Sequence, residues 1–393
     1  MDNNNEMPKV SEELLDEWAM KPESAVALHL KQQLLPVEAD GSGQYVIFPP
    51  TYADIGYNID KLSNGESVAL IDSVGSQANR MEPLFKKGGP LASFVPQFEI
   101  TIGNGKKVSI FDLAHRAADA TIQLTPDLST KVSDAFKELQ IGNAAPLCSI
   151  APTSLVFGVW DSRGGTREKR PRLVRSIIRA WNVETLHAAA QFNSVWKEFD
   201  EDQRVELEKE AKAKKVELSK IGLKDAPSVF RKTKTPQYIN GSPNPEARVQ
   251  GGVLVRGRIE RQLTINLVAL RGLHSGNDKE KTEHLRRYLL GLSLLVATTI
   301  TDLFLREGCN LRYGDVKEDI WYAVPRRGEP ERVDLSQSHD LVKKYTTDAL
   351  RHFKSDWPED KEYKFDIKEV KKLIKKIDEN EEEPEGSGGA SSE

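Results

Sequence analysis

The sequence predicts an α+β fold with insertions, and three observations lead to this class. Alternating apolar residues typical of half-buried strands recur along the chain, with helical spacings between them in no regular order. The chain has 393 residues, of which 38% are apolar, and this is enough for a large core. No repeat of fixed period is visible, which disfavours solenoids and propellers. An irregular mixture of strands and helices is typical of the α+β class.

The first strands are predicted near the start of the chain. Apolar and polar residues alternate over 26–31, and further apolar runs follow at 45–48 and 68–71. The third run ends in the turn 72–75, and residues 76–85 carry apolar side chains at helical spacing. We expect the polar side chains at this strand-to-helix turn to face a ligand groove.

The middle of the chain combines a hairpin with helical and strand-like stretches. Alternating apolar residues on both sides of an Asn-Gly turn predict a β-hairpin over 95–111. Residues 112–122 have helical spacing, and the apolar run 155–160 predicts a strand. Residues 172–183 fit either one face of a helix or one side of a strand.

The second half begins with an insertion. Residues 197–224 predict a charged helical insertion, and residues 225–252 predict a loop rich in Pro, Asn and Gly. The apolar run 253–255 follows, and alternation over 263–269 then predicts a strand. The remaining predicted elements are a strand at 320–324 and helices at 281–306, 339–354 and 366–377.

The net charge of −4 conceals an uneven distribution. Residues 1–20 hold six acidic residues and one lysine, and residues 377–393 hold seven acidic residues and no base. Without these ends, residues 21–376 carry about +8. We interpret the chain as an acidic N-terminal extension, a basic body and an acidic flexible tail. A basic body is compatible with a polyanionic partner.

Several classes of protein are disfavoured. The longest apolar run, at 289–300, is shorter than the about 20 residues that a membrane span needs, so no membrane partner is expected. The first residues lack the basic and apolar regions of a secretory signal. Cys148 and Cys309 form no metal-binding or disulfide pattern, which fits a reducing cytoplasm.

The densest cationic segment follows the apolar run 155–160. From 163 to 179 seven basic residues accompany one acidic residue, and the bases are Arg163, Arg167, Lys169, Arg170, Arg172, Arg175 and Arg179. Guanidinium groups donate paired hydrogen bonds to phosphate oxygens, and nearby glycines let backbone amides approach the same anion. These residues are predicted to contact a nucleic-acid backbone, and the alternative is a solvated loop.

A second basic group follows a pair of glycines. Gly251 and Gly252 precede Arg256, Arg258 and Arg261, with apolar residues between them. Glycine beside arginine again suggests close approach to an anion, and we include both glycines with Arg256 and Arg258 among the predicted contacts. The alternative is the charge alternation common on the solvent face of a strand.

Support for catalysis is weak. On a helix, His115 would share a face with Asp112 and Asp119, as a base with orienting carboxylates or as a metal site. Pairing of Arg116 with either carboxylate is the simpler interpretation. His187 has one carboxylate nearby, and Walker, Gly-x-Ser-x-Gly, His-Glu-x-x-His and dinucleotide motifs are absent. We therefore expect no enzyme activity, no metal and no cofactor.

Four stretches together resemble one protein family. The specific stretch is Asp72-Ser73-Val74-Gly75-Ser76-Gln77-Ala78-Asn79-Arg80, and the weaker ones are 115–120, 155–162 and 267–271. In combination they resemble the backbone subunit of type I-U (I-G) CRISPR surveillance complexes (Cascade), which belongs to the RAMP superfamily. The resemblance extends over about residues 20–325.

The resemblance implies an RRM-like (ferredoxin-like) palm with inserted helical and hairpin subdomains. Copies of such a subunit polymerise along one CRISPR RNA, contact other subunits of the complex and present the spacer for pairing with target DNA, without cutting. Its guide-covering hairpin is assigned to 95–111, and the implied setting is antiviral defence in a prokaryotic cytoplasm. RNA contact is carried over to Ser76, Gln77, Asn79, Arg80, His115 and Arg116.

Two alternatives stay open. One is a RAMP-type endoribonuclease that processes precursor CRISPR RNA with His115 or His187 as general acid or base. The other is a generic single-strand nucleic-acid binder, in which Trp160 and Trp181 are the nearest stacking candidates. The charged helical insertion and the acidic tail have no assigned role.

Overall fold

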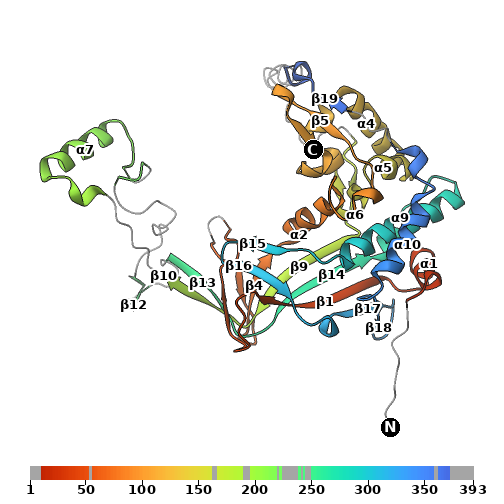
Figure 1. The fold of residues 1–393 in the computed structure, drawn as a ribbon, viewed down its shortest axis with the longest axis horizontal. Coiled ribbons are helices and arrows are strands. Elements are labelled where there is room, and N and C mark those ends of the chain that lie inside the picture. Colours follow the sequence, from red (N-terminus) through yellow and green to blue (C-terminus); the bar gives the residue numbers. More distant parts are fainter. Residues whose placement is uncertain are drawn as a thin grey trace, which may run out of the picture.

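The chain forms a mixed α+β structure, as the sequence predicts. The computed structural model describes residues 10–52, 55–161, 166–188, 195–218, 221–223, 238–239, 242–243, 249–357 and 362–371. Figure 1 shows a large twisted sheet with helices along one side, a second group of helices above them, and an arm that carries α7 away from the body.

The helices among the described residues differ in length. They are α1 (Glu12–Met20), α2 (Val74–Met81), α3 (Ala120–Gln123), α4 (Pro126–Gln140), α5 (Ala145–Ile150), α6 (Pro152–Phe157), α7 (Glu201–Ala213), α8 (Leu267–Arg271), α9 (Lys279–Thr298) and α10 (His339–Leu350). Among the described residues, α4, α7, α9 and α10 have 12 to 20 residues, and the other helices are shorter.

The strands fall into one large sheet and several small ones. The large sheet contains β1 (Ala27–Pro36), β3 (Ile59–Lys61), β4 (Ser67–Asp72), β9 (Val174–Trp181), β14 (Ile259–Asn266), β15 (Leu303–Arg306), β16 (Cys309–Tyr313), β17 (Ile320–Val324) and β18 (Glu331–Val333). The small sheets contain β2 (Tyr45–Ile47), β5 (Glu99–Thr101), β6 (Lys107–Ser109), β7 (Val159–Trp160), β8 (Lys169–Arg170), β10 (Val183–Ala188), β11 (Tyr238–Ile239), β12 (Ser242–Pro243), β13 (Val249–Val255) and β19 (Glu362–Lys364).

Four strands of the large sheet have the arrangement of an RRM. They lie side by side in the order β17, β1, β14, β9, and every neighbouring pair is antiparallel. Along the chain, helices separate β1 from β9, and α9 separates β14 from β17. This is the βαββαβ topology of the ferredoxin-like fold. The RRM-like palm is therefore present, and β4 extends it beside β9.

The burial pattern gives the palm one covered face. Leu28 and Leu30 on β1 and Leu263 and Ile265 on β14 are buried in the main core. Their neighbours in sequence lie on the opposite face and are partly exposed. The buried helix α9 packs on β14 on the covered side (Figure 1). Buried and more exposed side chains therefore alternate along these strands, so the palm has one face in the core and one face that is open.

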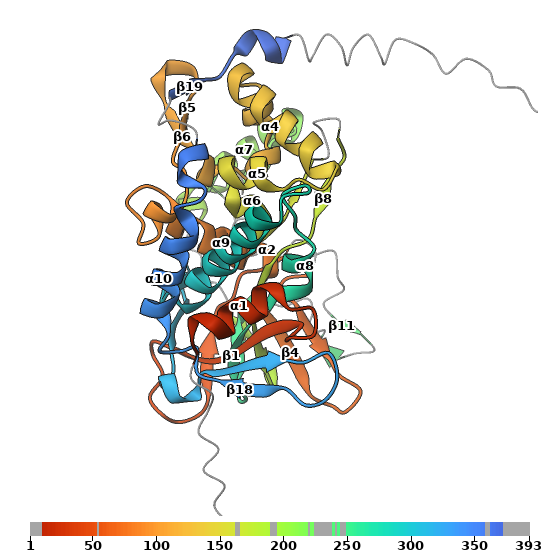
Figure 2. The same cartoon turned by 90° about the vertical axis from the view of Figure 1, so that its right-hand side faces the viewer.

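Residues between β4 and β9 form most of the helical region above the palm (Figure 2). The predicted hairpin 95–111 is present as β5 and β6, and β5 also pairs in parallel with β19. The run 155–160 was predicted as one strand but forms α6 and the short β7. Pro152 at the start of α6 and Gly158 directly after it explain why a helix forms and then ends there.

A long arm leaves the palm between β9 and β14. β10 and β13 pair antiparallel, β2 joins β13, and α7 lies beyond them (Figure 1). Asn182, with φ +51°, turns the chain from β9 into β10. The predicted insertion thus contains α7, and the predicted loop 225–252 already contains the start of β13 at Val249. The chain thus has two hairpins, β5–β6 within 95–111 and the longer arm, and the guide-covering role of 95–111 stays a prediction.

Three further predictions need correction. Residues 12–20 are not a separate extension, because α1 buries Leu15 and Trp18 in the main core. The strand predicted to reach 269 ends at Asn266, where the Asn266 side chain caps α8. The helix predicted for 281–306 ends at Thr298 and is followed by β15. Residues 172–183 contain the strand β9, and the tail 377–393 lies outside the described residues.

None of the helices in the described part of the chain is long and apolar enough to cross a membrane.

Candidate nucleic-acid interface

The open face of the palm is the best candidate for a functional surface. Side chains that pair directly across antiparallel strands lie on the same face of the sheet. One such row crosses five strands and consists of Arg332, Tyr322, His29, Thr264 and Arg175. A second row consists of Gln33, Glu260, Arg179 and Leu70. These residues, together with Lys31, Gln262 and Ile177, form the surface called the open face.

Cations predominate on the open face. Lys31, Arg175 and Arg332 are exposed, and Arg179 is partly exposed. The carboxylate of the face, Glu260, has an oxygen 3.3 Å from Nε of Arg258. The surface therefore presents several positive charges on rigid strands, in fixed spacing. Such an arrangement binds phosphates along a polyanionic chain.

Polar contacts hold the middle of this face in place. Nδ1 of His29 lies 3.0 Å from Oγ1 of Thr264, within hydrogen-bond distance. Burial and the nearby charge of Lys31 lower the pKa of His29, which keeps its imidazole neutral near pH 7. Nζ of Lys31 lies 5.9 Å from the ring centroid of Tyr322. Lys31 is thus supported by an aromatic ring while it stays exposed.

The two central strands carry no aromatic side chain on the open face. Their residues there include His29, Lys31, Gln33, Glu260, Gln262 and Thr264. In RRM proteins that stack bases, aromatic residues occupy the sheet surface. Tyr322 on β17 and Trp181 at the end of β9 lie at the margins, and Cζ of Arg258 lies 4.7 Å from the Trp181 ring centroid. The centre of the face is suited to sugar and phosphate groups rather than to stacked bases.

The structure separates the predicted cationic segment 163–179 into parts. Arg175 and Arg179 lie on β9 and belong to the open face. Lys169 and Arg170 lie on β8, where Nζ of Lys169 is 5.6 Å from the ring centroid of Trp160. Arg170 pairs with Glu168, and Arg172 donates to the carbonyl oxygen of Phe157 at 3.0 Å. Arg167 is exposed with φ +55°, and Arg163 lies outside the described residues.

The specific stretch 72–80 contributes mainly to a buried network. Gln77 is 2% exposed, and its amide donates to Asp72 at 2.6 Å and accepts from Ser176 at 2.7 Å. Arg80 donates to Asp72 and to the carbonyl oxygens of Phe304 and Leu305.

These contacts hold α2 on the sheet and cap the carbonyls of β15. The prediction that Gln77 contacts RNA is therefore wrong, because its polar atoms are buried and paired. Arg80 is also engaged within the protein. Ser76 is partly exposed and Asn79 is exposed, so these two stay predictions.

The predicted constellation around His115 does not form. Residues 110–123 break into short turns and α3, so the three side chains share no helical face. Asp112 pairs with Lys86 at 2.8 Å, and Asp119 accepts backbone N–H groups, including that of His115. The His115 side chain is exposed. In the described residues, no group of three His, Cys, Asp or Glu side chains is placed to hold a metal ion.

Arg116 is an internal contact rather than a free cation. Its Nε lies 2.7 Å from Oε2 of Glu82, which is 5% exposed. Burial raises the pKa of Glu82, and the charge of Arg116 opposes this shift. Cζ of Arg116 also lies 5.5 Å from the ring centroid of Phe157. The prediction of RNA contact by Arg116 is therefore replaced by a structural role.

The second predicted basic group lies where the arm joins the palm. Gly252 has φ +107°, and a Cβ atom there would lie 3.0–3.2 Å from atoms of Val46, Ile47 and Phe48. Close packing of β13 against β2 is sufficient to explain the glycine, and its role in anion approach stays a prediction. Gly251 lies next to it on β13. Arg256 pairs with Glu184 at 2.6 Å and is exposed.

Several residues of the open face were missed. Lys31, His29, Tyr322 and Arg332 lie far apart in sequence and form no dense charge run. The alternation of 26–31 identified the strand, but the pairing of β1 with β14 and β17 was needed to show which polar residues meet. The His187 side chain lies outside the described residues.

One protein family matches this chain. Residues 28–185 match the family model described as CRISPR-associated protein GSU0053. The matched segment begins within β1 and ends within β10, so it includes β4, α2 and β9. The match covers about two fifths of the chain, and over these residues the chain is similar to CRISPR-associated proteins. No curated protein matches the chain.

Proposed function

We propose that this chain is a non-catalytic CRISPR RNA-binding backbone subunit of a surveillance complex. Copies of it line one guide RNA, contact other subunits and present the spacer for pairing with target DNA. The observation that carries the proposal is the basic open face of an RRM-like palm, with Lys31 on β1, Arg175 and Arg179 on β9, and Arg332 on β18.

The chemistry of this face supports a sequence-tolerant mode of binding. Cations on central and flanking strands hold phosphates, and the central strands place no aromatic ring under the bases. Bases left free by the protein are available for Watson–Crick pairing, which then supplies the sequence specificity. The arm formed by β10 and β13 leaves the palm beside Arg179 and Trp181 and is suited to cover the bound strand.

The nuclease alternative has less support. A general acid or base needs an orienting partner within hydrogen-bond reach. The carboxylates nearest His115 in sequence are used by Lys86 and by backbone amides. Cleavage of precursor CRISPR RNA by the purified protein, abolished in His115→Ala, would favour the nuclease.

The test is RNA retention by the full chain coexpressed with a CRISPR array. The triple variant Lys31→Glu/Arg175→Glu/Arg179→Glu reverses three charges of the open face. We expect the unaltered chain to copurify with a discrete, nuclease-protected RNA that carries several protein copies, and the variant to retain at least tenfold less RNA.

The matched control is Lys137→Glu/Arg351→Glu/Lys354→Glu. These three exposed cations lie on α4 and near the end of α10, away from the open face, and the same total charge is reversed. We expect this variant to retain RNA. Equal loss in both triple variants, or no RNA bound to the unaltered chain, would reject the proposed interface.

A further inference from the structure

The open face has a neutral centre between its cations. Tyr322, His29, Thr264 and Arg175 lie side by side in one row across β17, β1, β14 and β9. Arg175 is exposed on the outer strand of this row, whereas His29 and Thr264 are partly buried on the two central strands. A strand that follows the cations with its phosphates therefore brings its other groups onto His29 and Thr264.

One ring nitrogen of His29 is used within the protein. Nδ1 lies 3.0 Å from Oγ1 of Thr264, so this hydrogen bond orients the ring. Because burial lowers the pKa of His29, the ring is neutral near pH 7, and Nε2 is then either a donor or an acceptor, according to the tautomer. A ligand group that both donates and accepts matches Nε2 in either tautomer.

The neighbouring polar groups of β14 are engaged with each other. Nε2 of Gln262 donates to Oε1 of Glu260 at 2.5 Å, and Nε of Arg258 lies 3.3 Å from Oε2 of the same carboxylate. The contact of His29 with Thr264, by comparison, uses Nδ1 of the ring alone. His29 is therefore the side chain of the central strands that best combines a fixed orientation with a polar atom left for a ligand.

Three kinds of group along a nucleic acid can meet Nε2 of His29. A phosphate oxygen only accepts, so it matches one tautomer alone and is held better by the charged Arg175 or Lys31. The edges of the four bases differ, so one ring nitrogen cannot serve them all. The ribose 2′-hydroxyl both donates and accepts, and it recurs at every ribonucleotide. It is therefore the group that fits a sequence-tolerant face.

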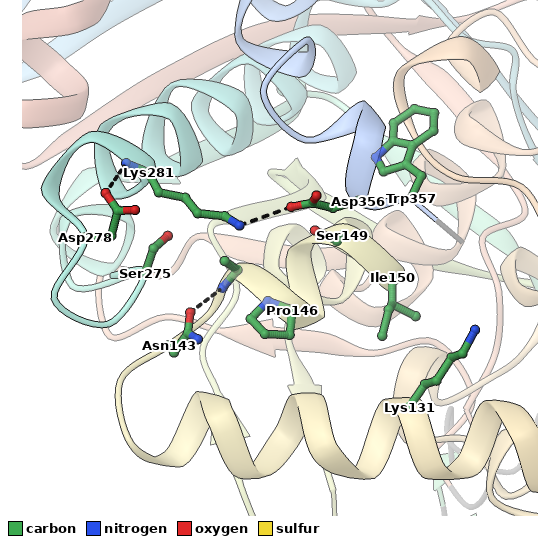
Figure 3. A pocket seen from close by; sticks show the side chains of 11 residues that line it. Lys131, Asn143, Pro146, Ser149, Ile150, Ser275, Asp278, Lys281, Asp356 and Trp357 are labelled. Atoms are coloured by element: carbon green, nitrogen blue, oxygen red, sulfur yellow. Dashed lines mark hydrogen bonds and ion pairs between the residues drawn. The ribbon is translucent and has the colours of Figure 1, made fainter. Parts of the chain in front are cut away.

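The pocket in the helical region is not an alternative site for the strand. It has a volume of about 660 Å³ and lies between α4, α5, α9 and the segment that ends at Trp357 (Figure 3). At its polar end, Nζ of Lys281 lies 3.1 Å from Oδ2 of Asp356, and Asp278 adds a second carboxylate. This end carries a net negative charge, which repels a nucleic-acid backbone. Recognition of the sugar is therefore expected on the open face.

We propose that His29 and Thr264 form a subsite for the ribose 2′-hydroxyl group of the bound strand. The inference rests on the proposed function and deepens it, because the open face then distinguishes RNA from DNA in addition to holding a polyanion. Neighbouring strands lie about 4.8 Å apart, so a nucleotide whose phosphate pairs with Arg175 has its sugar over Thr264 and His29. Nε2 of His29 contacts the hydroxyl, and Thr264 positions the ring.

The test compares RNA with DNA that carries the same bases. A single-stranded uridine oligomer of about ten nucleotides and the matching deoxyuridine oligomer differ only in the 2′-hydroxyl groups. Fluorescence anisotropy at one fixed salt concentration gives the affinity of each for the full chain, after bound RNA has been removed at high salt. We expect the RNA to bind at least about threefold more tightly than the DNA, because the DNA leaves Nε2 of His29 without a partner.

Two variants locate this preference. His29→Leu removes Nε2, and Thr264→Val removes the hydroxyl that orients the ring. Each should weaken RNA binding about threefold to tenfold and change DNA binding less than twofold, so the preference for RNA is lost. A misfolded variant would lose both affinities, so retained DNA binding is itself the control for folding. Thr347→Val, the same change at an exposed position of α10, should leave both affinities unchanged.

Arg175→Ala should give the opposite pattern. Loss of a phosphate contact weakens RNA and DNA binding by the same factor and leaves their ratio unchanged. Equal affinity of the unaltered chain for the two oligomers would overturn the ribose subsite. An equal loss for both oligomers in His29→Leu and Thr264→Val, or no loss of RNA affinity in either variant, would also overturn it. The proposed RNA-binding function would survive these results, since it fails only when the open face retains no RNA.

Discussion

Arg261 and Arg175 lie on neighbouring strands of the same sheet but on opposite faces, and their guanidinium groups have opposite environments. Arg261 is 3% exposed and donates to Ser176 at 3.1 Å and to Gln32 at 3.2 Å. Arg175 is exposed on the open face, in register with Thr264. Side chains alternate between the two faces along a strand, so the position of an arginine in this alternation decides whether it stabilises the fold or is available to a partner. The number of charges nearby in the sequence does not decide it.

The buried Arg261 belongs to a continuous polar network. Arg261 connects through Gln32 to Asp319, whose carboxylate accepts from the Gln32 amide at 2.7 Å. It connects through Ser176 to Gln77 and so to Asp72. Burial lowers the pKa of Arg261 and raises the pKa of Asp319. The network ties α2 and the segment before β17 to the central strands.

The largest expected effect is on this network. Arg261→Ala removes a buried guanidinium and leaves Asp319 without the nearby positive charge. We expect the free energy of unfolding, measured by urea titration, to fall by about 3 kcal/mol. A loss below about 1 kcal/mol would show that the network contributes little and would break the contrast with the open face.

Much of the palm could be predicted from the sequence, because its strands have a strict period of two. The alternation over 26–31 and the polar turn at 72–75 located β1 and the end of β4. Arg175 and Arg179 were found for a different reason, as part of the dense cationic segment, and only the structure shows that they lie on the strand β9.

The remaining site residues depend on contacts that the sequence does not contain. The stretch 72–80 was specific as a motif, yet its Gln77 and Arg80 serve buried contacts with β9 and β15. Lys31 and Arg332 meet near Tyr322 only because β1, β17 and β18 pair in that register. Short helices such as α6 were also missed, because an apolar run of six residues does not distinguish a strand from a buried helix.

The next expected effect is a dependence of stability on pH that involves the open face itself. Burial, with a contribution from Lys31, lowers the pKa of His29 below its ordinary value of 6.5. The unfolded chain then binds more protons than the folded chain, so stability falls as pH decreases through about 6.5 towards the lower pKa of the folded state. His274, His284 and His339 have pKa values lowered mainly by burial and act in the same direction.

His29→Gln separates the contribution of the open face from the others. In urea titrations at several pH values between 7.5 and 5, the variant should lose less stability on acidification than the unaltered chain does. The same slope in both proteins would mean that His29 is no less protonated in the folded chain than in the unfolded one.

The smallest expected effect on stability belongs to Arg175→Ala, and it sharpens the comparison most directly. Because the side chain is exposed, the free energy of unfolding should change by less than about 0.5 kcal/mol. RNA affinity should nevertheless weaken, and the slope of log affinity against log salt should decrease by about one, as expected for one lost phosphate contact. Arg351→Ala, at the end of α10, is the control and should leave the salt slope unchanged. If Arg175→Ala destabilised the chain as Arg261→Ala does, or left the salt slope unchanged, the two faces of the sheet would not divide structure from binding.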